Sequence, residues 1–152
     1  EKLQADNEYP LLEAHKGQHA AFVKAVEELQ EMLEEDIRRG HSYVCCGEDG
    51  QLLATFYFAQ EEEPTYQTIE DGSWLDDAPY GVVHRITARQ GTKGVASYCL
   101  SWCFAQCGNL RIDPHRKNFP MQRALERNGF AYCGVIYVRD GSERIAFQKN
   151  NG

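Results

Sequence analysis

One helix and the turn before it constrain the fold of this chain more than any other feature. The segment Val95–Cys107 has the pattern of a helix that is apolar nearly all round, and such a helix has to be buried. A strand-forming stretch, Val82–Ala88, precedes it, and the turn Gly91–Gly94 joins the two. After Gly108 a short strand, Leu110–Asp113, follows. A strand, a helix and a strand in this order predict a right-handed unit with two parallel neighbouring strands.

The other segments predict a mixed α/β layout around this unit. Apolar residues recur at three- and four-residue spacing from Phe22 to Ile37, which predicts a helix that ends before Gly40. The expected elements after it are a hairpin of Tyr43–Cys46 and Gln51–Ala59, a long loop Gln60–Tyr80 with some helix around Tyr66–Asp71, the unit described above, a helix capped by Asn118, and a final hairpin of Tyr132–Val138 and Arg144–Lys149.

Length and composition fit one domain. The chain has 152 residues, of which 42% are hydrophobic and 26% charged, so we expect residues 1–152 to form a single domain. No apolar run reaches the ~18–20 residues that span a bilayer. The segment Glu1–Asp6 lacks the pattern of a signal peptide. We therefore expect a cytoplasmic protein, without a membrane partner, whose six cysteines are reduced.

Charge and cysteine spacing exclude two classes of site. The net charge of −7 argues against nucleic acid as a partner and is compatible with a cationic substrate. Cys99, Cys103 and Cys107 lie four residues apart on one helix face, but no Cys-x-x-Cys or nearby Cys–His pair accompanies them. We expect these cysteines to pack as small apolar residues, and we predict no metal site.

The turn Gly91–Gly94 has two interpretations. The free amides at the start of the following helix, with small residues around them, form an anion site that suits a phosphate group. Alternatively, the glycines only allow a tight connection between strand and helix. Neither the P-loop motif nor the dinucleotide-binding motif is present.

Several segments together resemble the core of the GNAT-type N-acetyltransferases. They are Val83–Ala88, Lys93–Ala96, Leu110–Asp113, Asn118 and Arg127–Phe130. The resemblance runs in element order from Tyr43 to Lys149. It implies one GNAT-like domain, with a mostly antiparallel sheet, one parallel strand–helix–strand unit and central strands that splay apart. It also implies acetyl-CoA as the acetyl donor, and a primary amine of a small molecule or an exposed peptide amine as the acceptor.

The resemblance also implies which residues hold acetyl-CoA. The backbone of the central strand would pair with the pantetheine arm, the amides of the turn would hold the pyrophosphate, and the next helix would add one contact. The implied residues are Ile86, Thr87, Ala88, Gly91, Thr92, Lys93, Gly94, Val95, Ala96 and Asn118. Three departures stand out: Gly91 replaces the usual Gln or Arg, Leu125 replaces a Tyr that protonates the thiolate, and no strand is evident before the first helix.

Acetyl transfer to an amine needs a base that takes the ammonium proton. His84 lies in the central strand shortly before the turn, and an unperturbed imidazole titrates near neutral pH. Asp113 and His115, at the end of the next strand, are the competing candidates. The alternative for His84 is a core histidine with satisfied hydrogen bonds.

The long loop is the candidate acceptor site, because aromatic rings beside carboxylates suit a cationic amine. The candidate residues are Tyr66, Glu70, Trp74, Asp76, Asp77 and Tyr80. The alternative is a surface loop with its aromatic rings packed on the sheet edge. For the whole chain, the alternatives to an enzyme are a non-catalytic acyl-CoA-binding sensor and an interaction module. The sequence leaves open whether the chain forms a homodimer.

Overall fold

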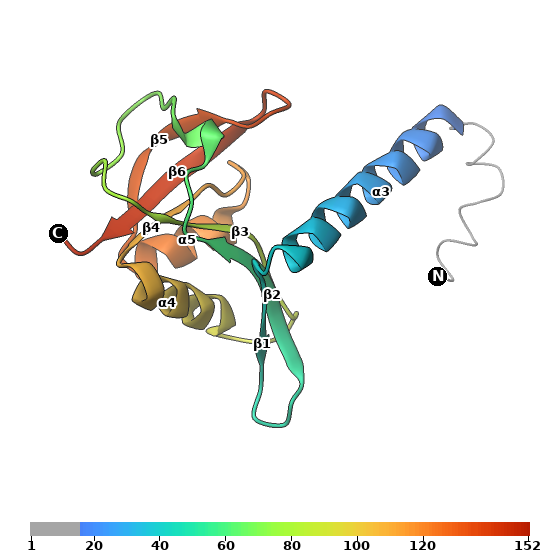
Figure 1. Cartoon of the computed structure of the whole chain (residues 1–152), viewed down its shortest axis with the longest axis horizontal. Helices are drawn as coiled ribbons and strands as arrows, with labels where there is room; N and C mark the ends of the chain where they lie inside the picture. The colour runs from blue at the N-terminus through green and yellow to red at the C-terminus, as the bar shows by residue number, and fades with distance from the viewer. Residues whose placement is uncertain (1–15) are drawn as a thin grey trace. The chain divides into compact units, whose positions relative to one another are not determined.

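A computed structural model of the chain describes residues 16–152 (Figure 1). The chain forms two compact units, residues 1–40 and residues 41–152. The segment Glu1–Asp6, whose pattern does not predict a signal peptide, lies outside the described residues. The expectation that residues 1–152 form a single domain stays a prediction.

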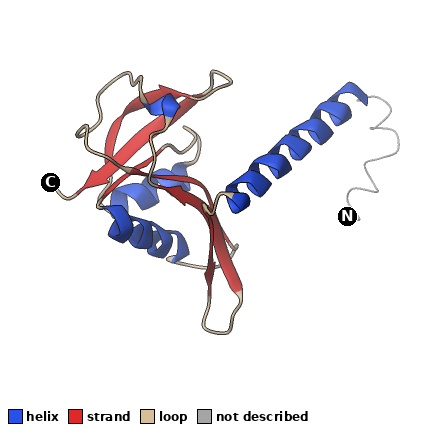
Figure 2. Cartoon of the chain, viewed as in Figure 1, coloured by secondary structure: helices blue, strands red, loops and turns tan. Residues whose placement is uncertain are grey.

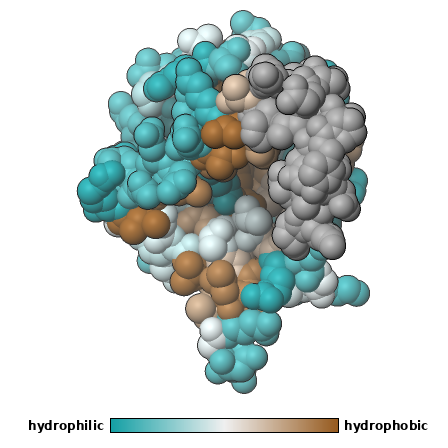
Figure 3. Space-filling model, turned by 90° about the vertical axis from the view of Figure 1, so that its right-hand side faces the viewer, coloured by the Kyte–Doolittle hydropathy of each residue, from teal (hydrophilic) through white to brown (hydrophobic). Residues whose placement is uncertain are grey.

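The first unit contains the predicted amphipathic helix, α3 (Lys16–Arg38). It ends as the sequence indicates, with Arg38 in the last turn and Gly40 in the left-handed region at φ +78°. Its apolar side chains are exposed, Phe22 and Ile37 most of all at 66%. Elsewhere Val44 and Tyr98 are also exposed, and Figure 3 shows brown apolar atoms among the teal hydrophilic surface. Over the described residues, no helix is long and apolar enough to span a bilayer.

The second unit contains a six-stranded sheet in the order β1-β2-β3-β4-β6-β5 (Figure 2). All neighbouring strands pair antiparallel except β3 and β4, which are parallel. This arrangement confirms the mostly antiparallel mixed sheet and both hairpins. The strands are β1 (Ser42–Cys46), β2 (Leu52–Ala59), β3 (Gly81–Ala88), β4 (Asn109–Ile112), β5 (Ala131–Tyr137) and β6 (Glu143–Asn150).

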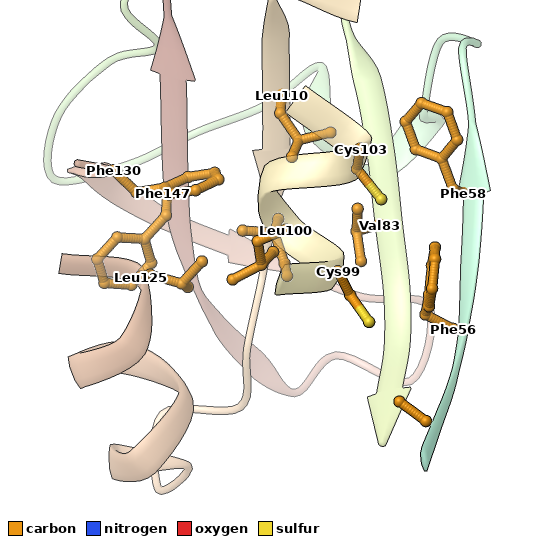
Figure 4. Packing of buried hydrophobic residues seen from close by; sticks show 12 residues of the cluster. Phe56, Phe58, Val83, Cys99, Leu100, Cys103, Leu110, Leu125, Phe130 and Phe147 are labelled. Carbon is orange, nitrogen blue, oxygen red and sulfur yellow. The ribbon is translucent and has the colours of Figure 1, made fainter. Parts of the chain in front are cut away.

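Helix α4 (Val95–Cys107) forms the centre of the main core. It connects the parallel strands β3 and β4, and Gly108 closes it with φ +70°. Figure 4 shows its buried side chains directed at the sheet, together with Leu125 of α5 (Phe119–Arg127). The two cysteines in this layer act as small apolar residues, as predicted. The labelled core residues are Phe56, Phe58, Val83, Cys99, Leu100, Cys103, Leu110, Leu125, Phe130 and Phe147.

A smaller core lies on the opposite face of the sheet, because successive residues of a strand face opposite sides. Val83 belongs to the α4 core, whereas Val82 packs with Ile136, Ala146 and Tyr66 of the long loop. The loop therefore covers this second face. This packing brings loop residues to the side of β3 on which His84 lies.

The predicted helix around Tyr66–Asp71 is wrong. The only helical turn of the loop is the 3-10 helix η1 (Pro64–Tyr66), which begins at the proline and is capped by Glu63. After it the backbone of Glu70 pairs with Val135 of β5 through two hydrogen bonds of 2.8 and 2.9 Å. Pairing with a strand requires extended backbone, so a helix cannot continue there.

Candidate functional site

The parallel strands β3 and β4 separate halfway along β3. Their last pair is Val83 with Ile112, while β3 continues to Ala88. Pro114 follows β4 and has no N–H for a ladder, and its carbonyl accepts from Ile145 of β6 instead. The chain after β4 thus stays with β6, and among the described residues no strand pairs with the β4-facing edge of His84–Ala88. We call this opening the β3–β4 wedge.

A β-bulge lies in β3 at the mouth of the wedge. The register with β2 shifts between the pairs Thr55–Thr87 and Tyr57–His84, which places one extra residue in β3. Arg85 there has a φ of +52°, a rare conformation for a residue with a side chain. Bulges re-aim backbone and side chains and occur often beside active sites. Nothing in the sequence signals this bulge.

The predicted phosphate turn lies at the open end of the wedge, between β3 and α4. Gly91 and Gly94 have φ values of +84° and +74°, and a Cβ on either would meet no atom within 4 Å. Over residues 16–152, no side chain caps α4 at Gly94, so the first amides of the helix face open space. Thr92 closes the turn by donating its hydroxyl to the carbonyl of Arg89. The space around the glycines and the free amides leave room for an anion such as a phosphate group.

The other implied cofactor residues flank this turn. Thr87 and Ala88 are exposed, and Ile86 is half-buried. Asn118 caps α5, as predicted, by accepting a hydrogen bond of 3.2 Å from the amide of Met121. Its side-chain oxygen is therefore engaged within the protein.

At the wedge His84 lies between two carboxylates. Its Nε2 is 3.2 Å from Oε1 of Glu63, which caps η1, and its Nδ1 is 3.8 Å from Oδ1 of Asp113, which follows β4. The imidazole also packs against Tyr57 of β2, with ring centroids 5.2 Å apart. The His84 side chain is 24% exposed, which leaves the imidazole reachable from solvent. Two of the three candidate bases, His84 and Asp113, are thus adjacent.

Asp113 is nearly inaccessible. The hydroxyl of Tyr66 donates to its Oδ1 at 2.5 Å, and Arg144 of β6 lies 3.8 Å from its Oδ2. Burial raises the pKa of Asp113, while the hydrogen bond from Tyr66 and the charges of His84 and Arg144 oppose this rise. In the same environment the pKa of Tyr66 is raised, chiefly by burial.

The third candidate, His115, lies in an exposed turn. Its Nδ1 accepts a hydrogen bond of 3.0 Å from the amide of Lys117, and its backbone forms a bridge with Arg144. Within the described residues no hydrogen bond or ion pair joins its ring to His84. The structure therefore separates His115 from the other two candidates.

The aromatic rings of the loop pack around a cation of the protein itself. Arg111 of β4 lies between Trp74 and Tyr80, with its guanidinium carbon 4.1 and 4.0 Å from their ring centroids. The indole of Trp74 also donates to the carbonyl of Tyr66. Tyr66 is 2% exposed and lies beneath the site rather than at its surface.

Asp76 anchors the same loop to the sheet. Its carboxylate accepts hydrogen bonds from the side chains of Asn109, Gln148 and Asn150, at 3.0, 3.3 and 2.5 Å. These bonds lower the pKa of Asp76, that from Asn150 most. The carbonyl of Asp76 in turn accepts from Arg111 at 2.8 Å. These contacts join three buried polar residues of the sheet, Asn109, Arg111 and Gln148, to the loop.

The two remaining loop candidates face solvent. Glu70 accepts a hydrogen bond of 3.3 Å from Tyr137 at the exposed side of β5. Asp77 lines a cavity of about 370 Å³ together with Glu61, Glu62 and Tyr80. Among residues 16–152 no group of three or more His, Cys, Asp or Glu side chains is arranged to hold a metal ion.

Sequence reasoning missed three residues that contact the candidate bases. They are Glu63, Tyr57 and Arg144. The acidic stretch Glu61–Glu63 and the proline after it are visible in the sequence, but nothing there links them to a histidine 21 residues later.

Comparison with solved structures identifies the fold. No protein-family model matches the sequence, and no curated protein sequence matches it. A GNAT-family acetyltransferase from Streptococcus agalactiae 2603 superposes with a TM-score of 0.73 and 27% identity, covering 97% of this chain and 91% of that one. GNAT-family acetyltransferases from Bacillus cereus ATCC 10987 and Listeria monocytogenes 4b F2365 both give a TM-score of 0.56 and 18% identity. These cover 80% and 77% of this chain, and 79% and 68% of their own.

Proposed function

We propose that this chain, which has the GNAT fold, is an acetyl-CoA-dependent N-acetyltransferase whose acceptor is a primary amine of a small molecule or an exposed amino group. The structural neighbours are acetyltransferases, which supports acyl transfer as the class of reaction. One observation carries the proposal. The β3–β4 wedge opens beside His84, and the turn with free helix amides lies at the end of the same strand.

The donor side follows from the open edge of β3. Backbone groups of Ile86–Ala88 would pair with the amides of the pantetheine arm, as a neighbouring strand would. The amides of Lys93–Ala96 would bind the pyrophosphate at the positive end of α4. Asn118, at the start of α5, would contact the donor from the next helix. The acetyl thioester would then lie in the wedge beside His84.

His84 would act as the general base. The acceptor enters as R–NH₃⁺ and gives one proton to the imidazole, and the free amine then attacks the thioester carbonyl. The new C–N bond forms, the C–S bond breaks, and a second proton from nitrogen ends on the CoA sulfur. The products are the amide, the CoA thiol and one proton, which leaves through His84. A thiol has a pKa of about 8.5, so the CoA thiolate is a fair leaving group. This fits a site in which Leu125 stands where the family has a tyrosine that protonates the thiolate.

Ligand-dependent melting tests the donor site. At a hundred times its dissociation constant a ligand adds roughly 2.7 kcal/mol to the free energy of unfolding. For a domain of this size that raises the melting temperature by about 5–11 °C. We expect acetyl-CoA to give this shift and NAD and ATP to give none. Equal shifts in melting temperature with acetyl-CoA, NAD and ATP would contradict the proposal.

Turnover separates an enzyme from a binding module. We expect thiol release from acetyl-CoA in the presence of primary amines, and at least a hundredfold lower turnover in His84→Ala with acetyl-CoA affinity retained. The same assay on His115→Ala tests the competing candidate. A larger loss of turnover in His115→Ala than in His84→Ala would identify His115 as the general base. Binding of acetyl-CoA without turnover across a panel of amines would identify a non-catalytic acyl-CoA sensor.

A further inference from the structure

The two ring nitrogens of His84 have different surroundings. Nε2 is within hydrogen-bond distance of the Glu63 carboxylate at 3.2 Å, whereas the 3.8 Å between Nδ1 and Asp113 exceeds such a distance. Both side chains of the close pair are mostly buried, at 24% and 21% exposure. Water therefore competes only weakly for the bond between them.

Glu63 is itself held in place from several directions. Its Oε2 accepts from the amide and the hydroxyl of Thr65, at 3.2 and 3.0 Å. Its backbone amide donates to the hydroxyl of Tyr80 at 2.9 Å. One carboxylate oxygen thus caps η1 and the other faces the imidazole, so the carboxylate cannot turn away without losing the cap.

Glu63 is ionised at neutral pH. The hydrogen bond with His84, and the bonds from Thr65, lower the pKa of Glu63 to about 2 against the opposing effect of burial. An ionised carboxylate only accepts hydrogen bonds. Nε2 must therefore be the donor, and in the neutral imidazole the lone pair then lies on Nδ1.

We propose that Glu63 is the positioning residue for the base: it keeps the proton of neutral His84 on Nε2, so that Nδ1 takes the proton of the acceptor amine. The assignment of Nδ1 as the reacting nitrogen rests on the proposed function, whereas the tautomer does not. Nδ1 is the nitrogen on the Asp113 side, where β4 ends and the wedge opens. The imidazolium formed by the transfer is paired with Glu63 and faces Asp113.

The remaining ionisable groups near His84 come from every neighbouring element. Tyr57 of β2 packs against the ring and hydrogen-bonds Glu61, and Arg85 of β3 lies over the Tyr57 ring. Tyr66 of η1 and Arg144 of β6 act through Asp113. Among these groups Glu63 alone is in hydrogen-bond distance of the imidazole.

The test compares Glu63→Gln with Glu62→Gln. Both substitutions remove one negative charge, but Glu62 is exposed and caps nothing in the described structure. The glutamine at position 63 retains an oxygen that can accept from Thr65, so η1 should remain folded. Nitrogen-15 NMR of the protein alone, with labelled histidine, reports which ring nitrogen carries the proton. Rate–pH profiles of thiol release report the effect on turnover.

In the parent and in Glu62→Gln we expect the neutral His84 ring to carry its proton on Nε2 alone. In Glu63→Gln we expect both tautomers and a turnover at least tenfold lower, because the imidazole loses the carboxylate that fixes its proton on Nε2. Glu63→Asp, which restores the charge, should recover part of the turnover. A proton on Nδ1 in the parent, or equal effects of both glutamine substitutions, would overturn the proposal. If the parent shows no acetyl transfer, the proposed function fails, and the NMR result still decides the tautomer.

Discussion

Replacing Tyr66 by Phe removes a single oxygen from the buried pair with Asp113. The ring and its contact with Trp74, 5.0 Å away between centroids, are retained. The Tyr66 hydroxyl donates to the Asp113 carboxylate at 2.5 Å, and the two residues are only 2% and 7% exposed. Hydrogen bonds to charged groups contribute about 1.5–3 kcal/mol, and water cannot replace the hydroxyl here. We therefore expect a loss of about 2–3 kcal/mol at neutral pH, or about 4–12 °C in melting temperature.

The loss should depend on pH in a defined direction. Burial raises the pKa of Asp113 above its unfolded value, so this group favours folding most at low pH, and that contribution is lost as the pH rises through the folded pKa. The Tyr66 hydroxyl opposes the rise by stabilising the carboxylate. Removing it raises the pKa of Asp113 further and makes ionisation in the folded state more costly. The difference between parent and variant should therefore be largest at neutral pH and shrink as Asp113 becomes protonated.

Melting curves over a range of pH, with Tyr132→Phe as control, test this reasoning. Tyr132 also donates to an aspartate, Asp71 at 2.7 Å, but that pair is exposed to solvent. A surface substitution of this kind changes stability by within about 0.5 kcal/mol. The argument would be refuted if the stability losses of Tyr66→Phe and Tyr132→Phe differed by less than that amount. A stability loss in Tyr66→Phe that is independent of pH would also refute it.

Four further outcomes are expected. Gly94→Val should nearly abolish the acetyl-CoA melting shift, whereas Gly50→Val, with a similar φ of +82° and equally open surroundings, should suffer comparable strain and keep the shift. Asp76→Asn should destabilise the chain by about 1 kcal/mol in denaturant titrations, because the carboxylate that accepts from both Asn109 and Asn150 becomes an amide with one accepting oxygen. Asp77→Asn should have little effect. Arg111→Met should cost about 2–3 kcal/mol in the same titrations, since it removes a cation held between two rings. In steady-state kinetics, the rate with a cationic acceptor should fall more steeply as salt rises than the rate with a neutral acceptor of equal size. Equal salt dependence of the two rates would show that the carboxylates of the long loop do not attract the acceptor.

The strand–turn–helix unit could be predicted from the sequence because its signals are local. The strand, the glycine turn and the apolar helix follow one another without interruption from Val82 to Cys107, and each has a composition that allows few alternatives. Asn118 as a helix cap was predicted for the same reason. The bulge at Arg85 was not, since no glycine marks it.

The contacts that bring the loop to His84 and Asp113 could not be predicted because they join distant segments. Glu63 and His84 are 21 residues apart, Tyr66 and Asp113 47, and Asp76 and Asn150 74. Aromatic residues beside carboxylates suggested a cationic ligand, and in the structure Trp74 and Tyr80 enclose a cation, Arg111 of the chain itself. Composition cannot distinguish an internal cation from an external one.

The anchoring of Asp76 has a consequence for the order in which the protein is assembled during synthesis. Two of its partners, Gln148 and Asn150, belong to β6, which follows every other described strand along the chain and is inserted between β4 and β5. On the ribosome the Gly91–Gly94 turn and α4 are therefore made well before β6, which supplies two of the side-chain donors to Asp76. A nascent chain that lacks β6 would already carry the Gly91–Gly94 turn, but Asn109 of β4 would be the one remaining side-chain donor to the Asp76 carboxylate among the three described above. Completion of the last strand thus supplies the donors that complete the anchoring of the loop at Asp76.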